Sequence, residues 1–72
     1  MERFFRYSLE HKRAIRMMWM EADGRLSQGR VVVEAIGKDA VDILVLRPPR
    51  KLSLAFDRVL SCDYAPDDDG LQ

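Results

Sequence analysis

From Arg13 to Tyr64, apolar and polar residues alternate with a period of two, and short turn sequences interrupt this alternation. A period of two is typical of β-strands that bury one face. The interruptions include Asp-Gly, Gly-Lys and Pro-Pro, which favour turns or cannot join a ladder of hydrogen bonds. The chain is therefore predicted to be mainly β. The predicted strands are residues 13–21, 29–36, 41–47, 51–56 and 59–64.

Residues 2–11 have a helical pattern instead. Phe5 and Leu9 stand four residues apart, and Phe4 and Tyr7 stand three apart, so each pair lies on one face of a helix. A helix of this length is not stable alone in water. We therefore expect it to dock over an open end of the sheet through Phe5 and Leu9.

Five short antiparallel strands with a common inner face tend to curl into a small barrel. A flat open sheet is the alternative, but it would leave strand edges and half-apolar faces exposed. A chain of 72 residues has room for one domain. We place this helix-capped barrel domain at residues 1–65. Residues 66–72 are polar and contain three adjacent aspartates, so they are predicted to form a flexible acidic tail.

The sequence predicts no catalytic site, metal or cofactor. Cys62 is the single cysteine and is predicted to face the core with Leu60 and Tyr64, where a thiol is inert. His11 follows the helix, where a cation is favourable. Neither residue has the partners that a nucleophile or a zinc site needs. A lone cysteine favours a cytoplasmic location, and without a stretch of about 20 apolar residues we expect no membrane association.

Basic residues are the candidates for ligand binding. Residues 1–64 carry twelve Lys and Arg against nine acids, a net charge of +3. Small barrels often bind single-stranded nucleic acid through a basic groove with aromatic stacking. A solvated surface is the alternative, because the charge excess is small and most aromatic residues follow the inward pattern. Two candidates lie at outward strand positions and three surround the Pro-Pro turn. The candidates are Arg16, Arg30, Arg47, Arg50 and Lys51.

An apolar patch on the outer face is a second candidate site. Met18 and Met20 alternate with Ile15 and Trp19, and Val32 adds to the same outer face. Exposed apolar patches mark partner surfaces, so Met18, Met20 and Val32 are predicted to mediate self-association or contact with a protein partner. The alternative is that the N-terminal helix covers them.

Asp57-Arg58 interrupts the last apolar run, LSLAFDRVLSCDYA, and is either a binding pair or a turn. Aspartate suits turns because its side chain can accept hydrogen bonds from nearby backbone N–H groups. We therefore predict that this pair is the tight connection between the fourth and fifth strands.

The runs LEHKRAIRMMWMEADGRLSQGRVVVEAIG and LSLAFDRVLSCDYA resemble the WYL domain, an Sm-like member of the small SH3-type barrels. Arg16, Trp19 and Asp23-Gly24 fill the places of its basic-aliphatic strand, aromatic residue and acidic-glycine turn, and Phe56-Asp57-Arg58-Val59 resembles its closing motif. The likeness covers about residues 5–64. The aromatic triad that names the family is absent, because the corresponding strand reads VDILVLR.

The resemblance implies a helix-capped SH3/Sm-like barrel that senses a ligand or binds nucleic acid in transcription regulation. With the residues above, it predicts a non-enzymatic binding module that is nucleic-acid-associated or an accessory to transcription regulation. A self-associating protein–protein adaptor is the first alternative. A WYL-type sensor of a small ligand is the second. Fold alone does not choose among them.

Overall fold

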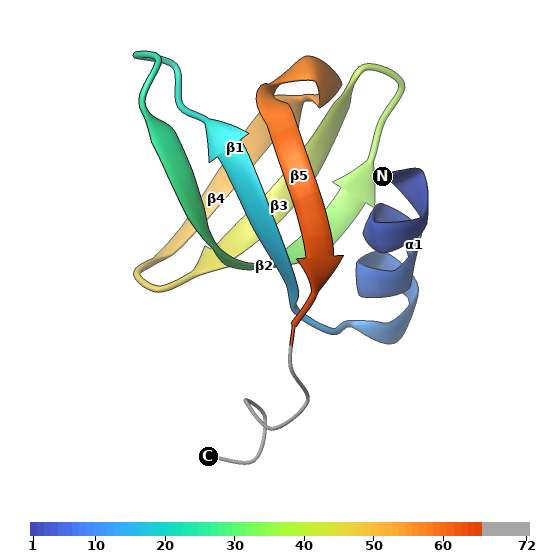
Figure 1. Ribbon diagram of the computed structural model, residues 1–72. Coiled ribbons are helices and arrows are strands. Elements are labelled where there is room, and N and C mark those ends of the chain that lie inside the picture. Colours follow the sequence, from blue (N-terminus) through green and yellow to red (C-terminus); the bar gives the residue numbers. More distant parts are fainter. Residues whose placement is uncertain (66–72) are drawn as a thin grey trace.

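The computed structural model describes residues 1–65, in which one helix precedes five strands. The prediction of a mainly β chain with an N-terminal helix and five strands is confirmed (Figure 1). The predicted acidic tail at 66–72 lies outside the described residues. The elements are α1 (Glu2–His11), β1 (Ile15–Met20), β2 (Leu26–Ile36), β3 (Ala40–Leu46), β4 (Pro49–Ala55), the short 3-10 helix η1 (Phe56–Arg58) and β5 (Val59–Tyr64).

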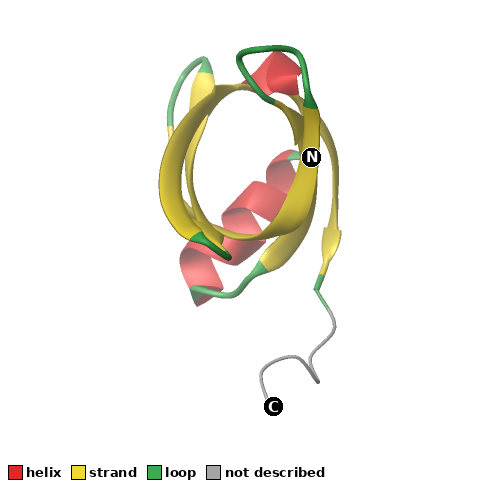
Figure 2. Ribbon diagram, turned by 90° about the vertical axis from the view of Figure 1, so that its left-hand side faces the viewer, coloured by secondary structure: helices red, strands yellow, loops and turns green. Residues whose placement is uncertain are grey.

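All neighbouring strands are antiparallel, in the order β4-β3-β2-β1-β5. The sheet curls strongly, so that Figure 2 looks along a ring of strands with α1 behind it. β4 and β5 are the two edges of the sheet and η1 joins them, so the ring is not closed by strand pairing. The predicted curl is present, and the barrel is an open one.

The inner face of the curled sheet holds the core, and the alternation predicted this face correctly along β1. On β1, Ile15, Met17 and Trp19 are buried, while Arg16 and Met18 point the other way. Each core side chain is at most 5% exposed. The full core is Phe5, Ile15, Met17, Trp19, Val31, Val33, Val41, Ile43, Val45, Leu54 and Val59.

A β-bulge changes the alternation near the end of β2. The register of β2 against β3 shifts between Val33 and Ala35, which leaves Glu34 as an extra residue. A regular alternation would bury Ala35 with Val33, but Ala35 is exposed. Ile36 instead pairs with Val41 and packs against the core.

A second irregularity lies in β5. Val59 pairs with Trp19 and Ser61 pairs with Met18, so Leu60 has no residue opposite it on β1. Because of this bulge, Val59 is buried and Leu60 is 40% exposed. The predicted inward position of Leu60 is therefore wrong, since strict alternation cannot anticipate an extra residue.

α1 closes one end of the open barrel, as predicted, and packs against β2 and β5. Phe5 is 4% exposed and its ring stacks on Phe56 at a centroid distance of 6.0 Å, while Leu9 is partly buried. Ser8 is fully buried and links the helix to the sheet. Its Oγ donates to the carbonyl oxygen of Arg13 (2.7 Å) and accepts the N–H of Val33 (2.8 Å). No helix within residues 1–65 has the length and apolarity needed to span a bilayer.

Candidate functional site

Two of the predicted anion-binding residues lie directly opposite each other. Strand pairing places Arg16 of β1 across from Arg30 of β2, on the outer face of the sheet. Asp63 of β5 lies on the other side of Arg16, so a row of one acid and two bases crosses three strands. Like charges directly opposite each other are destabilising. Asp63 adds one negative charge to this row.

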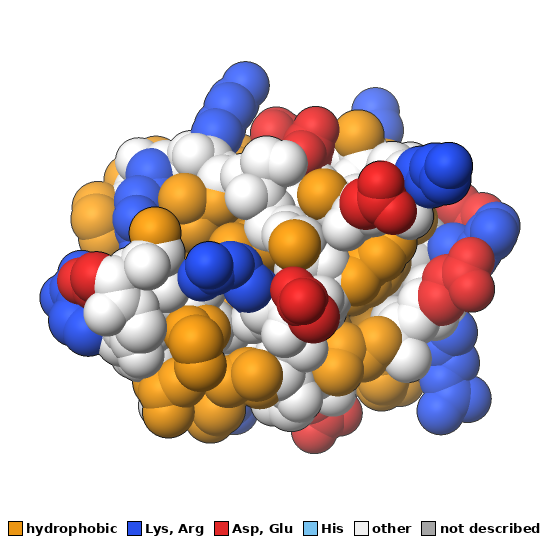
Figure 3. Space-filling view, turned by 90° about the horizontal axis from the view of Figure 1, so that it is seen from above, with side chains coloured by type: hydrophobic (Ala, Val, Ile, Leu, Met, Phe, Trp, Pro, Cys, Tyr) orange, Lys and Arg blue, Asp and Glu red, His pale blue; other side chains and the backbone are white. Residues whose placement is uncertain are grey.

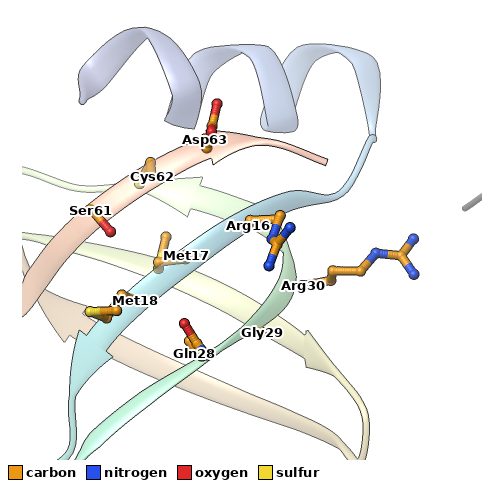
Figure 4. A pocket seen from close by; sticks show the side chains of 9 residues that line it. All are labelled: Arg16, Met17, Met18, Gln28, Gly29, Arg30, Ser61, Cys62 and Asp63. Carbon is orange, nitrogen blue, oxygen red and sulfur yellow. The ribbon is translucent and has the colours of Figure 1, made fainter. Parts of the chain in front are cut away.

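This row lies in a shallow groove with a volume of about 470 Å³, formed by the outer face of β2, β1 and β5. Figure 4 shows Arg16 and Arg30 on neighbouring strands, with the Arg30 side chain extending away from that of Arg16, and Ser61 on β5. Ser61, Gln28 and the two arginines supply hydrogen-bonding groups to the same space. The lining residues are Arg16, Met17, Met18, Gln28, Gly29, Arg30, Ser61, Cys62 and Asp63.

Gln28, Ser61 and Asp63 were not predicted as site residues. Gln28 is near Arg30 in the sequence, but Ser61 and Asp63 come from a strand about 30 residues further along the chain. Antiparallel pairing of β1 with both β2 and β5 brings them together. No local sequence pattern indicates that these residues lie together, because strand pairing is non-local.

Cys62 lies in the same groove and packs against the core, in agreement with its predicted inward position. Burial raises the pKa of the Cys62 thiol to about 11. The sulfur is therefore protonated at neutral pH, and a protonated thiol is a poor nucleophile. The groove supplies hydrogen bonds and positive charge, rather than an activated sulfur.

The structure separates the three basic residues of the Pro-Pro turn from the groove. Arg47 and Lys51 are exposed on the hairpin between β3 and β4 and do not line the groove. Arg50 forms an ion pair with Glu21, at the end of β1. The predicted group of five basic residues is thus divided, and Arg16 and Arg30 alone line the groove.

Glu21 is the centre of a polar cluster at the barrel end opposite α1. Its Oε2 accepts hydrogen bonds from the Ser27 hydroxyl (2.7 Å), from the indole N–H of Trp19 (3.2 Å) and from Arg50. Its backbone carbonyl accepts a hydrogen bond from Arg58 (3.0 Å). The Glu21 side chain is 12% exposed. The sequence did not identify Glu21, because Arg50 and Arg58 lie 29 and 37 residues away.

The hydrogen bond from Ser27 and then that from Arg50 hold the pKa of Glu21 below its usual 4.5. A depressed folded-state pKa contributes stability that is complete above the unfolded value and is lost as the pH falls through the folded value. We therefore expect a loss of stability below about pH 4.5, and Glu21→Gln should make this loss shallower. Thermal unfolding at a series of pH values checks this. Glu10→Gln, on the exposed face of α1, is the control. If Glu21→Gln loses thermal stability at low pH as steeply as the wild type does, the assignment to Glu21 is contradicted.

The Asp57-Arg58 pair forms the tight connection between β4 and β5, as predicted. Asp57 is exposed, whereas the Arg58 guanidinium reaches the carbonyl of Glu21. The pair thus joins two strands, and Arg58 ties η1 to the end of β1.

The predicted self-association residues do not form one patch. Met20 pairs with Leu26, which is 63% exposed, and Met18 lies on the same outer face. Val32 lies further along β2 and pairs with Leu44, with Arg30 between it and the methionines. Figure 3 shows hydrophobic side chains gathered towards its lower left, while charged ones are scattered.

The alternative that α1 covers the two outer methionines is wrong. Phe5 and Ser8 of α1 are buried against the inner side of the sheet, together with Met17. Met18 and Met20 alternate with Met17 and so point to the opposite face. Both are half-buried.

Comparisons with protein-family models, curated proteins and solved structures found no match. Within residues 1–65, no three His, Cys, Asp or Glu side chains are grouped so that they could hold a metal ion. The function is therefore inferred from the groove, whose chemistry is that of paired guanidinium groups with neighbouring hydroxyl and amide groups.

Proposed function

We propose that this protein is a non-enzymatic binding module that binds the phosphate backbone of nucleic acid through the Arg16–Arg30 groove, in a nucleic-acid-associated or transcription-regulatory complex. The observation that carries the proposal is the cross-strand pair of Arg16 and Arg30, which share a groove with Ser61 and Gln28. Guanidinium groups present several N–H donors in a planar fork that matches phosphate oxygens. The WYL resemblance, itself a proposal, favours the same class of function.

Electrostatics explain why two arginines would be placed in this way. Strand pairing places two positively charged side chains at directly opposite positions of one sheet face. Phosphates of a backbone lying along the groove would form charge-assisted hydrogen bonds with both side chains. Such contacts position the backbone of a nucleic acid but do not read its sequence. We therefore expect modest affinity that depends strongly on salt and little on base composition.

The double replacement Arg16→Ala with Arg30→Ala tests this proposal. Each phosphate contact contributes about 0.7 to the slope of log affinity against log salt for a single strand, so the slope should fall by about 1.4. The affinity at low salt should fall by about tenfold or more. Fluorescence anisotropy with a labelled oligothymidylate of about 15 nucleotides measures both quantities.

The matched control removes the same charge elsewhere. Arg25→Ala with Lys38→Ala alters two turns and leaves the groove intact. If the control reduces binding as much as the groove variant does, net charge and not the groove is responsible. Absence of binding by the wild type even at low salt would refute the proposal.

A WYL-type small-ligand sensor remains a second proposal, because a groove of about 470 Å³ is within the size range of small-molecule sites. The ligand would be a small anion held by the same two arginines. Titration calorimetry with a mononucleotide separates the two ideas. If the oligonucleotide binds no more tightly than the mononucleotide, the sensor proposal is favoured.

The adaptor alternative is favoured by the apolar pair of half-buried Met20 and exposed Leu26. Here we expect the wild type to form dimers or larger species, and Met20→Lys with Leu26→Lys to yield monomers, since buried lysines would have to lose their hydration. Light scattering measures the mass. Val32→Lys is the control outside this pair, and a wild type that is monomeric at every concentration would exclude the alternative.

A further inference from the structure

A second pocket lies at the start of α1, where this helix meets the barrel. Its volume is about 460 Å³, which is within the size range of small-molecule sites. Three separate segments form its walls, namely the start of α1, the turn between β2 and β3, and η1. Figure 1 shows the start of α1 beside the end of β2. Within residues 1–65, this pocket and the Arg16–Arg30 groove share no lining residue, so they are separate sites.

The inner wall of the pocket is apolar and mostly aromatic. Phe5 of α1 is 4% exposed, and the ring of Phe56 is stacked on it at a centroid distance of 6.0 Å and an interplanar angle of 17°. Ile36 also lines the pocket and packs against the core. Phe56 itself remains 37% exposed. Aromatic rings stack at centroid distances of about 4.5–7 Å, so the ring of a ligand can lie on the accessible part of Phe56.

Backbone hydrogen bonds fix the walls of the pocket. The N–H of Phe56 donates to the carbonyl oxygen of Asp39, which ties η1 to the turn between β2 and β3 (3.1 Å). Within that turn, the N–H of Gly37 donates to the carbonyl oxygen of Ala40 (2.8 Å). The helix is held in turn by the Ser8 hydroxyl. The pocket is therefore preformed, as small-molecule sites usually are.

Two charged residues line the pocket, and their charges are not equally available. The Glu2 carboxylate accepts hydrogen bonds from the Arg6 guanidinium at 3.1 and 3.2 Å, so its charge already has a partner. Lys38, in the turn between β2 and β3, is exposed and forms no ion pair with another residue in the range 1–65. The charge that the pocket offers to a ligand is therefore the positive one of Lys38.

We propose that this pocket binds a small aromatic carboxylate, with its ring on Phe56 and its carboxylate on the Lys38 ammonium group. The inference goes beyond the proposed function and is independent of it, because neither Arg16 nor Arg30 lines the pocket. The ligand would touch α1, the turn and η1 at once. A ligand that binds only when α1 is docked stabilises the docked state.

Titration with phenylacetate, followed by backbone amide shifts in NMR spectra, tests the site. The amides of residues 2–5, 36–38 and 56 should shift saturably, with a Kd on the order of 1 mM for a ligand of this size. Phenylacetamide keeps the ring but lacks the charge, and it should bind about two- to fivefold more weakly, as expected for one exposed ion pair. Acetate lacks the ring and should cause no saturable shift of these amides at the same concentrations.

Two variants assign the contacts. Lys38→Gln should weaken binding of phenylacetate to the level of phenylacetamide and leave phenylacetamide binding unchanged. Lys51→Gln is the matched control, because Lys51 is an exposed lysine outside the pocket. Phe56→Leu should weaken binding of both ring compounds by about two- to tenfold, through loss of the ring contact.

Hydrogen exchange at Val33 measures the link between this ligand and the helix. The N–H of Val33 donates to the Ser8 hydroxyl, so its exchange reports docking of α1. At a phenylacetate concentration about nine times its Kd, exchange through release of the helix should slow by about tenfold. Unchanged exchange at this concentration would show that the ligand does not contact the docked helix and would overturn the proposal.

Three further results would overturn it. They are the absence of saturable shifts with phenylacetate, equal affinity for phenylacetate and phenylacetamide, and unchanged phenylacetate affinity in Lys38→Gln. Shifts centred on Arg16 and Arg30 would place the acid in the groove and would also contradict the proposal. Binding of nucleic acid by the groove is measured separately, so it stands or fails independently of these results.

Discussion

Trp19→Ala should unfold the protein or leave it barely stable at room temperature. The Trp19 side chain is 2% exposed and is among the largest of the fully buried side chains. Replacement of a buried tryptophan by alanine costs about 3–5 kcal/mol, through lost burial and the cavity that remains. A domain of this length has a total stability of about 4–11 kcal/mol, at about 0.05–0.15 kcal/mol per residue. The substitution therefore removes much or all of the stability.

The loss reaches beyond packing, because the Trp19 indole N–H also donates to Glu21. Urea denaturation followed by circular dichroism measures the free energy of unfolding without relying on the tryptophan signal. Trp19→Phe should cost less, since it keeps most of the apolar volume and removes the donor. Leu26→Ala, at a side chain that is 63% exposed, is the matched control and should change stability little. Full stability in Trp19→Ala would contradict the assigned core.

Phe5→Ala should release α1 from the end of the barrel. Phe5 is 4% exposed, and its ring is stacked on that of Phe56. The expected cost is about 3–5 kcal/mol. A helix of 10 residues cannot persist in water without docking, so its loss of contact is also a loss of helical structure. Ser8, which joins α1 to β2, would move away with it.

Hydrogen exchange distinguishes release of the helix from a general loss of stability. The N–H of Val33 is bonded to the Ser8 hydroxyl, so its exchange reports docking of α1 directly. In Phe5→Ala, this amide should lose protection first, while amides shared by β2 and β3 remain protected. Arg6→Ala, on the exposed face of the same helix, is the control. Retained protection at Val33 in Phe5→Ala would show that Phe5 does not anchor the helix.

Much of the fold could be predicted from the order of residue types in the sequence. Residues 2–11 carry a helical pattern and form α1 over that range. The alternation of Ile15, Met17 and Trp19 correctly identified the buried face of β1. Errors arose where a bulge inserts an extra residue, as at Leu60, because a single inserted residue reverses the faces of the positions around it.

The candidate site was only half predictable. The outward positions of Arg16 and Arg30 follow from alternation, but their position opposite each other depends on the register between β1 and β2. Arg50 resembled the other basic residues in the sequence, yet the fold pairs it with Glu21. The ring contacts of Tyr64 depend on where α1 meets β5. Each of these outcomes is a contact between segments far apart in the chain.

The sequence by itself determined the type of each element and most of the inward-facing side chains, because periodicity arises from the geometry of one helix or one strand and is written in neighbouring residues. The tertiary structure alone decided the strand order, the two bulges, the pairing of Arg16 with Arg30 and Asp63, and the ring contacts between Tyr64 and α1. These features depend on pairing free energies between distant segments. A local sequence pattern does not specify those pairing free energies. The arrangement that forms is the one in which the core packs.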